Sequence, residues 1–425
     1  MRLIRAAAPL LAALLAAGPS AAADASGAKR FEWSTKSKEA RALLSELQGR
    51  IEHFQFGPSN VELARNLVAA DPTFAIGQYY LSVVLPGDEA LATYEKSLEL
   101  ARNASDGERR FIEAMVHVRR NQGADFRKSI EPMEALARDY PGERLVFAIL
   151  GQLQNGDGRS DKAREAFEKA QTIGPRSPRI ASFLAGDDLL KGRYAEAREA
   201  YAAIEKELQK GSAPFSIRYG IAFSHLYEGR PDAAIESLET YLAEYRAGGL
   251  DQQFPEVFIW NSIARIHLET GRFEQAMKAY ERGYDSVPAS KLPEDQKTTW
   301  LGRLRHGRCR VLARMGKHDE AWKEAEAVKA MIETGGEPAK QYWPAYHYLA
   351  GYVKLEAGEN EKAIEHLKQA DPNDPFHKLL LARALERAGR KDEAKEAYKQ
   401  IVESGWPGIE RPLAFGEAKK KLETL

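Results

Sequence analysis

The sequence predicts an all-α protein, a right-handed α-solenoid of stacked antiparallel helix pairs with about nine or ten repeats. Residues that favour helices, namely Ala, Leu, Glu, Lys and Arg, dominate the composition. A chain of 425 residues is too long for one compact core. It would form two or three globular domains or one elongated array. A glycine-led motif that returns at spacings of 31 to 45 residues favours the array.

Each copy of the motif begins with a glycine that is followed five residues later by an alanine. The copies read GRSDKA from Gly158, GRYAEA from Gly192, GRPDAA from Gly229, GRFEQA from Gly271, GKHDEA from Gly316, GENEKA from Gly358 and GRKDEA from Gly389. We expect each anchor glycine to end a helix, where the chain needs a left-handed turn. All copies but GRYAEA carry an acid three residues after the glycine, where it would meet the positive end of the next helix dipole.

The second half of each unit predicts a packed helix face. An aromatic or leucine usually follows the motif alanine by four residues, and offsets of five, nine and twelve from the glycine share one face of a helix. These residues are Phe167, Tyr201, Leu238, Tyr280, Leu367 and Tyr398, whereas Ala325 departs from the pattern. We interpret them as core residues.

The pattern resembles the tetratricopeptide repeat, whose first helix carries a Trp, a Leu-Gly pair and a Tyr, and whose second carries Ala and Phe before a Pro. One unit supplies Trp260, Ile263, Ala264, Ala276, Tyr280 and Pro288, and another supplies Leu150, Gly151, Ala163, Phe167, Ala170 and Pro175. The resemblance covers most of residues 144–402 and implies a superhelix lined on its inner surface by the first helix of each pair. The segment ASDGERRFIEAMV is also similar to one that recurs in exported bacterial proteins of this repeat type.

The expected domain organisation follows from the strength of the repeat signal. We predict a signal peptide at 1–23, a flexible lead-in at 24–37, degenerate repeats at 38–143, tetratricopeptide repeats at 144–410 and a C-terminal capping helix at 411–425.

The first residues have the layout of a secretory leader. Arg2 and Arg5 precede a short apolar stretch, and Ala21 to Ala23 fit a small-x-small cleavage site. The apolar stretch is shorter than the ~20 residues that span a bilayer. We therefore expect an exported protein, periplasmic or secreted, with no permanent membrane anchor after cleavage.

Composition and motifs point away from catalysis and from nucleic acid. Basic and acidic residues number 62 each, which does not suit a nucleic-acid binder. The sequence shows no phosphate-binding glycine loop, zinc-binding His-Glu-x-x-His helix or serine-hydrolase elbow. Cys309 is the only cysteine, and we expect it to be buried and inert. We expect no catalytic residues, no cofactor and no metal.

The remaining candidate is the inner surface. In the family geometry, inward positions fall about 13, 10 and 6 residues before each anchor glycine. These offsets give the predicted partner-binding residues Asn261, Arg265, Arg303, His306, Arg310, Tyr348 and Tyr352, and further upstream Tyr219 and Phe223. Arginines would grip a carboxylate and tyrosines would stack on the rest of an extended peptide. Alternatively, the arginines pair with glutamates on neighbouring helices and keep the face soluble.

The favoured function is a non-catalytic scaffold or adaptor of the bacterial cell envelope that binds another protein or an extended peptide. The site resembles, loosely, the carboxylate clamp of chaperone-binding family members, but only Asn261 has the chemistry of that clamp. Two alternatives stay open. One is a polysaccharide-binding module, which is favoured by the aromatic segment YWPAYHYLAGY with Trp343 and Tyr348. The other is an enzyme with a site between repeats.

Overall fold

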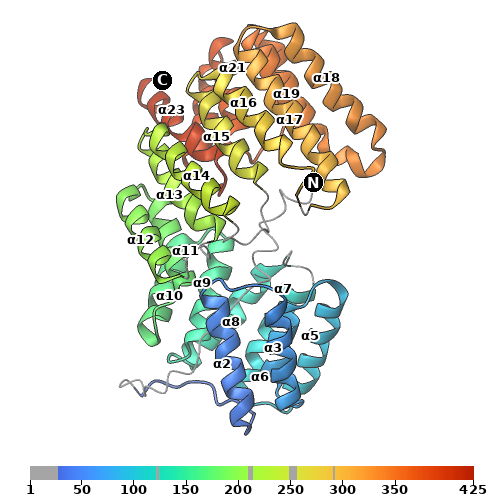
Figure 1. Cartoon of the computed structure of the whole chain (residues 1–425). Helices are drawn as coiled ribbons and strands as arrows, with labels where there is room; N and C mark the ends of the chain where they lie inside the picture. The colour runs from blue at the N-terminus through green and yellow to red at the C-terminus, as the bar shows by residue number, and fades with distance from the viewer. Residues whose placement is uncertain (1–26, 121–122, 124, 209–213, 248–255, 291) are drawn as a thin grey trace. The chain divides into compact units, whose positions relative to one another are not determined.

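The computed structural model describes residues 27–120, 123, 125–208, 214–247, 256–290 and 292–425. These residues form helices and contain no strand, which confirms the predicted all-α class (Figure 1). They fall into two compact units. The N-terminal unit holds the described residues up to 191 together with 200–208, and the C-terminal unit holds 192–199 together with 214–425. The predicted signal peptide lies outside the described residues.

The N-terminal unit is a succession of short helices, each packed against the next. They are α2 (Lys38–Glu52), α3 (Pro58–Ala70), α4 (Ala75–Val84), α5 (Gly87–Ala101), α6 (Asp106–Ala114), α7 (Val116–Arg120), the 3₁₀ helix η1 (Phe126–Ser129), α8 (Ile130–Asp139), α9 (Arg144–Gly156), α10 (Ser160–Ile173) and α11 (Pro178–Leu190). Helix α12 (Tyr194–Glu207) contributes residues to both units.

The C-terminal unit continues the same pattern of helix pairs. Its helices are α13 (Phe215–Tyr227), α14 (Pro231–Arg246), α15 (Val257–Glu269), α16 (Phe273–Asp285), α17 (Glu294–Arg314), α18 (His318–Thr334), the 3₁₀ helix η2 (Glu337–Tyr342), α19 (Trp343–Glu356), α20 (Asn360–Leu367), α21 (Pro375–Arg387), α22 (Lys391–Val402) and α23 (Glu410–Thr424). Consecutive helices contact one another, as expected of a solenoid.

The anchor glycines mark the turns within the helix pairs. All of them have positive φ angles, between 71° and 81°. At Gly271, as at every other anchor except Gly192, a Cβ would meet no atom within 4 Å. The left-handed backbone, and not a lack of room, therefore requires glycine here. The acids predicted three residues later do lie in the first turn of the following helix, as Asp161 does in α10 and Asp392 in α22.

The motif alanines and the residues four positions further form the core of the helix pairs. Ala276 and Tyr280 are 0% and 1% exposed, and the other copies are similarly buried. Two glycines make room for the rings. A Cβ on Gly151 would lie 2.7 Å from the ring of Phe167, and one on Gly307 would lie 2.5 Å from that of Tyr280. The prediction that these aromatics are core residues is confirmed.

In the C-terminal unit, alternate helices form a common inner layer. Helices α15, α17, α19, α21 and α23 contact one another in that order, and α16, α18, α20 and α22 each pack against the helix that precedes them. The layer closes on itself, because α23 also packs against α13 (Figure 1). Buried Arg411 of α23 donates a hydrogen bond of 2.6 Å to the hydroxyl of Tyr227 on α13, and Phe415 meets the same ring edge-on at 5.3 Å. This closure brings the inward side chains of distant repeats together.

The described part of the lead-in differs from the loose segment that we expected. Residues 27–37 contain no helix, but they pack against the N-terminal unit. Phe31 is 7% exposed, its ring meets that of Tyr140 at 4.9 Å, and its backbone N–H donates to the Glu143 carboxylate. Burial of an aromatic ring supplies the free energy that orders this segment.

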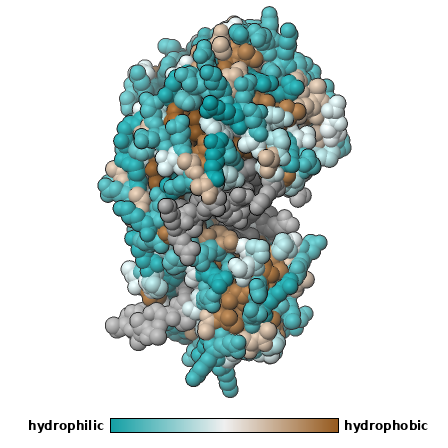
Figure 2. Space-filling model, viewed as in Figure 1, coloured by the Kyte–Doolittle hydropathy of each residue, from teal (hydrophilic) through white to brown (hydrophobic). Residues whose placement is uncertain are grey.

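The face of each unit seen in Figure 2 is mainly hydrophilic, with hydrophobic residues in patches. Among the described residues, the exposed large hydrophobic side chains are Phe56, Leu91, Leu190 and Met315. No helix in the described part of the chain has both the length and the apolar character needed to cross a membrane.

Candidate functional site

The candidate site is an arginine cluster on the inner layer of the C-terminal unit, made of Arg265 from α15 and Arg303 and Arg310 from α17. The three and four residue steps from Arg303 through His306 to Arg310 place these side chains on one face of α17. The structure thus brings together most of the residues that the sequence predicts for the site.

Arg310 is buried and its guanidinium is held by two tyrosines. It donates to the hydroxyl of Tyr280 at 2.9 Å and to that of Tyr348 at 3.3 Å, and Nε donates to the backbone carbonyl of His306. The phenols neutralise none of its charge while they stay protonated, and burial raises the pKa of both. Arg310 is therefore a fixed positive charge beneath the site.

Arg265 crosses the inner layer toward the C-terminal helix. Its guanidinium lies over the ring of Phe376 at 4.5 Å, and Nη1 is 3.7 Å from the carboxylate of Glu410 at the start of α23. Nε and Nη2 are buried and have no hydrogen-bond partner among the described residues. A glutamate of the inner layer therefore lies beside one of the arginines. This agrees in part with the alternative interpretation, in which the arginines pair with glutamates of neighbouring helices.

Arg303 is the arginine left without a carboxylate. It is half-buried, and no hydrogen bond or ion pair joins it to any of the described residues. Its guanidinium lies 5.1 Å from the ring centroid of Trp300. Burial lowers its pKa, the charge of Glu410 partly opposes this without forming an ion pair, and neighbouring Arg310 adds repulsion. The pKa of His306 lies well below its usual value, because burial and the surrounding arginines disfavour a further positive charge.

Two carboxylates and a histidine beside the arginines also determine the net charge of the site. Burial raises the pKa of Glu410, but the charge of Arg265 and the hydrogen bond from the Trp406 indole together outweigh it, so the net pKa lies below the usual value. Asp374 caps α21 by accepting from the backbone N–H groups of Phe376 and His377, and burial together with the Glu410 charge raises its pKa to about 7. Burial lowers the pKa of His377 to about 4. Close to neutral pH the three arginines thus outweigh the ionised carboxylates.

The remaining predicted residues are placed less usefully for a ligand. The amide of Asn261 donates to the carbonyl of Val257 on its own helix at 2.8 Å. Tyr348 is buried under the imidazole of His377 at 4.1 Å, and Tyr352 is 0% exposed. Neither tyrosine offers an open ring face, so the aromatic argument for polysaccharide binding rests on half-buried Trp343.

The sequence reasoning did not identify Phe376, Asp374, His377 and Glu410 as site residues. Phe376 stands 13 residues before Gly389 and could have been found by the same offset rule. Glu410 precedes no anchor glycine, and only the packing of α23 onto the inner layer brings it to Arg265. No local signal in the sequence predicts that contact.

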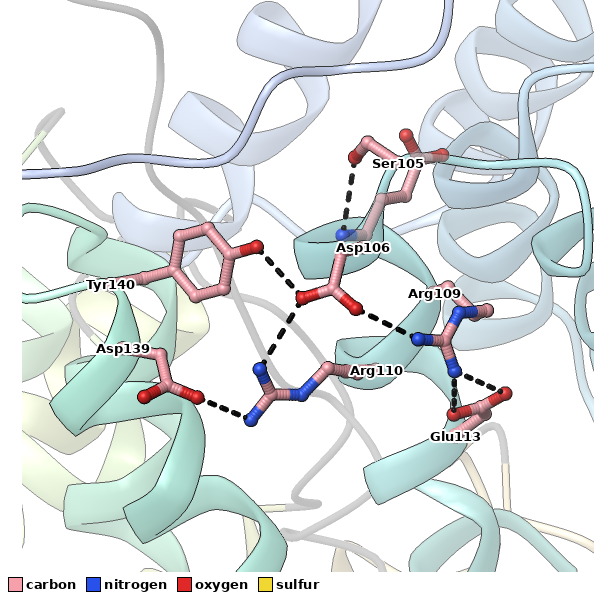
Figure 3. A network of polar contacts seen from close by, with 8 residues as sticks. Ser105, Asp106, Arg109, Arg110, Glu113, Asp139 and Tyr140 are labelled. Carbon is pink, nitrogen blue, oxygen red and sulfur yellow. Dashed lines mark hydrogen bonds and ion pairs between the residues drawn. The ribbon is translucent and has the colours of Figure 1, made fainter.

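A second polar region lies on the N-terminal unit, where α6 meets α8 (Figure 3). Asp106 accepts hydrogen bonds from Tyr140 at 3.0 Å and from Arg109 at 2.8 Å, while Arg110 pairs with Asp139 at 2.8 Å. A shallow hollow of 320 Å³ beside this network is lined by Arg110, Glu113, Ala114, His117, Pro132 and Ala135. The Arg110–Asp139 pair joins the two helices, whereas the Asp106–Arg109 pair lies within α6. Ion pairs this close to solvent each contribute little stability.

Other titratable groups carry no evident site. His347 and His366, from α19 and α20, approach to 3.0 Å between their Nδ1 atoms, and burial lowers the pKa of both. No group of three or more His, Cys, Asp or Glu side chains that could hold a metal ion occurs among the described residues. Cys309 is buried, as predicted, and burial raises its pKa to about 12.

Comparison with known proteins finds similarity to one repeat family. Residues 113–178 and 219–291 match one model of the tetratricopeptide repeat, and residues 354–405 match another. No curated protein matches the sequence.

Several solved structures are similar at low identity. A tetratricopeptide repeat protein from Parabacteroides merdae is 18% identical over 66% of this chain and 98% of its own, with a TM-score of 0.48. PilW, a type IV pilus biogenesis factor, is 17% identical over 52% of this chain and 92% of its own, with a TM-score of 0.40. Yeast Tom70 is 11% identical over 85% of this chain and 84% of its own, with a TM-score of 0.44. The matches to the repeat models show that these segments of the chain are similar to tetratricopeptide repeats.

Proposed function

We propose that the protein is a non-catalytic scaffold that holds an acidic segment of a partner protein at the arginine cluster of the C-terminal unit. The observation that carries this proposal is Arg303, a half-buried arginine with no hydrogen-bond or ion-pair partner among the described residues. A partly desolvated, unpaired guanidinium costs free energy, and a carboxylate from a ligand would remove that cost with a charge-assisted bond.

The surroundings of Arg303 favour a carboxylate over a neutral group. Arg310 lies about two turns further along the same face of α17 and is bonded only to tyrosines and a carbonyl, so its charge is not cancelled. Arg265 shares a single carboxylate, that of Glu410, at 3.7 Å. An arriving carboxylate would therefore enter a site with excess positive charge and low solvent exposure, where electrostatic attraction is stronger than in water.

The proposal can be tested with short synthetic peptides and the full chain. The probe is a fluorescent twelve-residue peptide of alternating Glu and Leu, and its partner is the same peptide with Gln in place of Glu. We expect the acidic peptide to bind with micromolar affinity and the Gln peptide to bind much more weakly. The affinity for the acidic peptide should fall as salt is added, because salt screens charges that remain partly exposed.

A matched pair of variants assigns the binding to the cluster. Arg303→Gln should weaken binding of the acidic peptide about tenfold, because a charge-assisted bond is lost. Arg305→Gln is the control, since Arg305 lies on the same helix but pairs with Glu324 at 2.9 Å. Equal losses in both variants, or equal affinity for the acidic and Gln peptides, would refute the proposal.

We further propose that this binding takes place outside the cytoplasm, in the cell envelope. The support is the leader-like layout of residues 1–23, with Arg2 and Arg5 before a short apolar stretch. Fractionation of cells that express the full chain, followed by N-terminal sequencing, tests this location. A mature protein that begins after Ala23 supports it, and an intact N-terminus in the cytoplasm contradicts it.

A further inference from the structure

The N-terminal unit contains a buried arginine that the chain itself does not neutralise. Arg179 is the second residue of α11 and is 6% exposed. No hydrogen bond or ion pair joins its side chain to any of the described residues, and its Nε is buried without a partner. It lies in a different unit from the arginine cluster and is therefore not part of that site.

Arg179 has no carboxylate of its own. The nearest acid that acts on it is Glu52 of α2, which already forms a buried ion pair with Arg144 of α9. Arg144 also donates to the backbone carbonyls of Ala170 and Pro175, which fixes it in place. The carboxylate that acts on Arg179 is therefore already paired with another arginine. Burial lowers the pKa of Arg179 to about 10, which shows how poorly its charge is compensated.

The position of Arg179 in its helix adds a second unfavourable term. It lies in the first turn of α11, which begins after the cap residue Ser177. The first turn carries the positive end of the helix dipole, where an anion is favoured and a cation is not. An arginine that is buried, without an ion-pair partner and placed against a helix dipole does not serve the stability of the fold. Such unfavourable electrostatic placement is common for residues that bind a ligand.

The turn beside Arg179 has two further features of a binding site. Phe56, between α2 and α3, is 39% exposed and lies over the Arg179 guanidinium at 5.8 Å. Phe54 in the same turn has a φ of 57°, and it is the only described residue other than glycine with a positive φ. A bulky residue in the left-handed region is strained, and such strain is often kept at ligand sites.

We propose that Arg179 and Phe56 bind a carboxylate that is attached to an apolar or aromatic group. The planar guanidinium matches the two oxygens of a carboxylate, and the ring of Phe56 offers an apolar surface for the attached group. A carboxylate supplies the one negative charge that pairs with the Arg179 guanidinium, whereas Glu52 nearby would repel a phosphate dianion more strongly. This site is additional to the proposed function and does not depend on it.

Isothermal titration of the full chain with benzoate, benzamide and inorganic phosphate tests the site. We expect benzoate to bind, and benzamide and phosphate to bind at least tenfold more weakly. Arg179→Met should weaken benzoate binding at least tenfold. Arg176→Gln is the matched control and should change it less than twofold, because Arg176 is an exposed neighbour that pairs with Glu207 at 2.9 Å. Equal affinity of wild type and Arg179→Met, or benzamide binding as well as benzoate, would overturn the proposal.

Two further readouts separate a ligand site from a structural arginine. Without ligand, Arg179→Met should unfold at a temperature no lower than the wild type, because it removes an uncompensated buried charge. A marked fall in its Tm, or failure to fold, would mean that Arg179 is structural and would refute the proposal. Phe56→Ala should keep the fold and lose the preference for benzoate over acetate, while an unchanged preference would remove Phe56 from the site.

Discussion

Replacing His377 by glutamine should change how the stability of the C-terminal unit depends on pH. The imidazole stacks on Tyr348 at 4.1 Å, and its Nδ1 has no partner among the described residues. Burial lowers its pKa from 6.5 to about 4. Between pH 6.5 and pH 4 the unfolded chain therefore binds a proton at this histidine, whereas the folded protein does not. The histidine lowers the free energy of unfolding as the pH falls through this range, and it has no such effect above pH 6.5.

The magnitude follows from the displacement of the pKa. Each pKa unit corresponds to about 1.4 kcal/mol, so the full penalty for His377 is about 3 kcal/mol, and about 2 kcal/mol of it develops between pH 7 and pH 4.5. Glutamine does not titrate. Whatever the substitution does at pH 7, His377→Gln should thus gain about 2 kcal/mol relative to wild type when the pH is lowered to 4.5.

Urea unfolding followed by tryptophan fluorescence measures this difference. Of the six tryptophans only Trp33 lies in the N-terminal unit, so the signal reports mainly on the C-terminal unit. The relevant quantity is the free energy of unfolding of the variant minus that of wild type, compared between pH 7 and pH 4.5. If this difference does not change with pH, the imidazole is not held neutral by the inner layer and our reasoning about the site is wrong.

Asp374→Asn provides a matched experiment with the opposite sign. Burial and the Glu410 charge raise the pKa of Asp374 from 3.8 to about 7. The folded protein therefore binds a proton that the unfolded chain releases, and this stabilisation is present at acid pH and is lost as the pH rises through 7. Relative to wild type, the variant should lose about 3 kcal/mol between pH 7 and pH 4.5. Asparagine can still cap the helix, so the difference isolates the charge.

Three further predictions concern packing. Gly307→Ala should destabilise the C-terminal unit by about 1 to 3 kcal/mol in urea unfolding, because its Cβ would lie 2.5 Å from the Tyr280 ring, whereas Gly302→Ala on the same helix meets only Met331 at 3.7 Å and should not destabilise it. Similar losses in both variants would contradict this packing. Gly271→Ala, at a φ of 78°, should lower the unfolding free energy by about 1 kcal/mol, and an unchanged value would argue against a left-handed turn. Arg411→Met should speed amide hydrogen exchange in α23 by about tenfold or more, because it removes the hydrogen bond that ties α23 to α13, and unchanged exchange would mean that this contact does not hold the helix.

The sequence predicted most of what is local to one helix pair. A glycine that ends a helix leaves a signature because only its backbone adopts the left-handed turn cheaply, and all seven anchor glycines do so. Motif alanines such as Ala276 are recognisable because close helix crossings tolerate little else. The offsets of the inward residues also follow from helix geometry, which is why Arg265, Arg303 and Arg310 could be placed on a common surface.

Features that depend on contacts between distant repeats could not be predicted. The pairing of Arg265 with Glu410 depends on the closure of α23 onto α13, which many small rotations between repeats determine together. For the same reason the burial of Tyr348 was not foreseen. The meeting of His347 with His366 joins two helices whose relative rotation no spacing in the sequence reveals.

The most direct test of the arginine cluster as the binding site is a gain of affinity in Glu410→Gln. This carboxylate is the one that the chain places beside Arg265, at 3.7 Å, and its removal frees a positive charge without changing the shape of the side chain. If an acidic segment binds here, the variant should bind the acidic peptide about tenfold more tightly than wild type. An affinity that stays the same or becomes weaker would show that acidic ligands do not bind at this cluster.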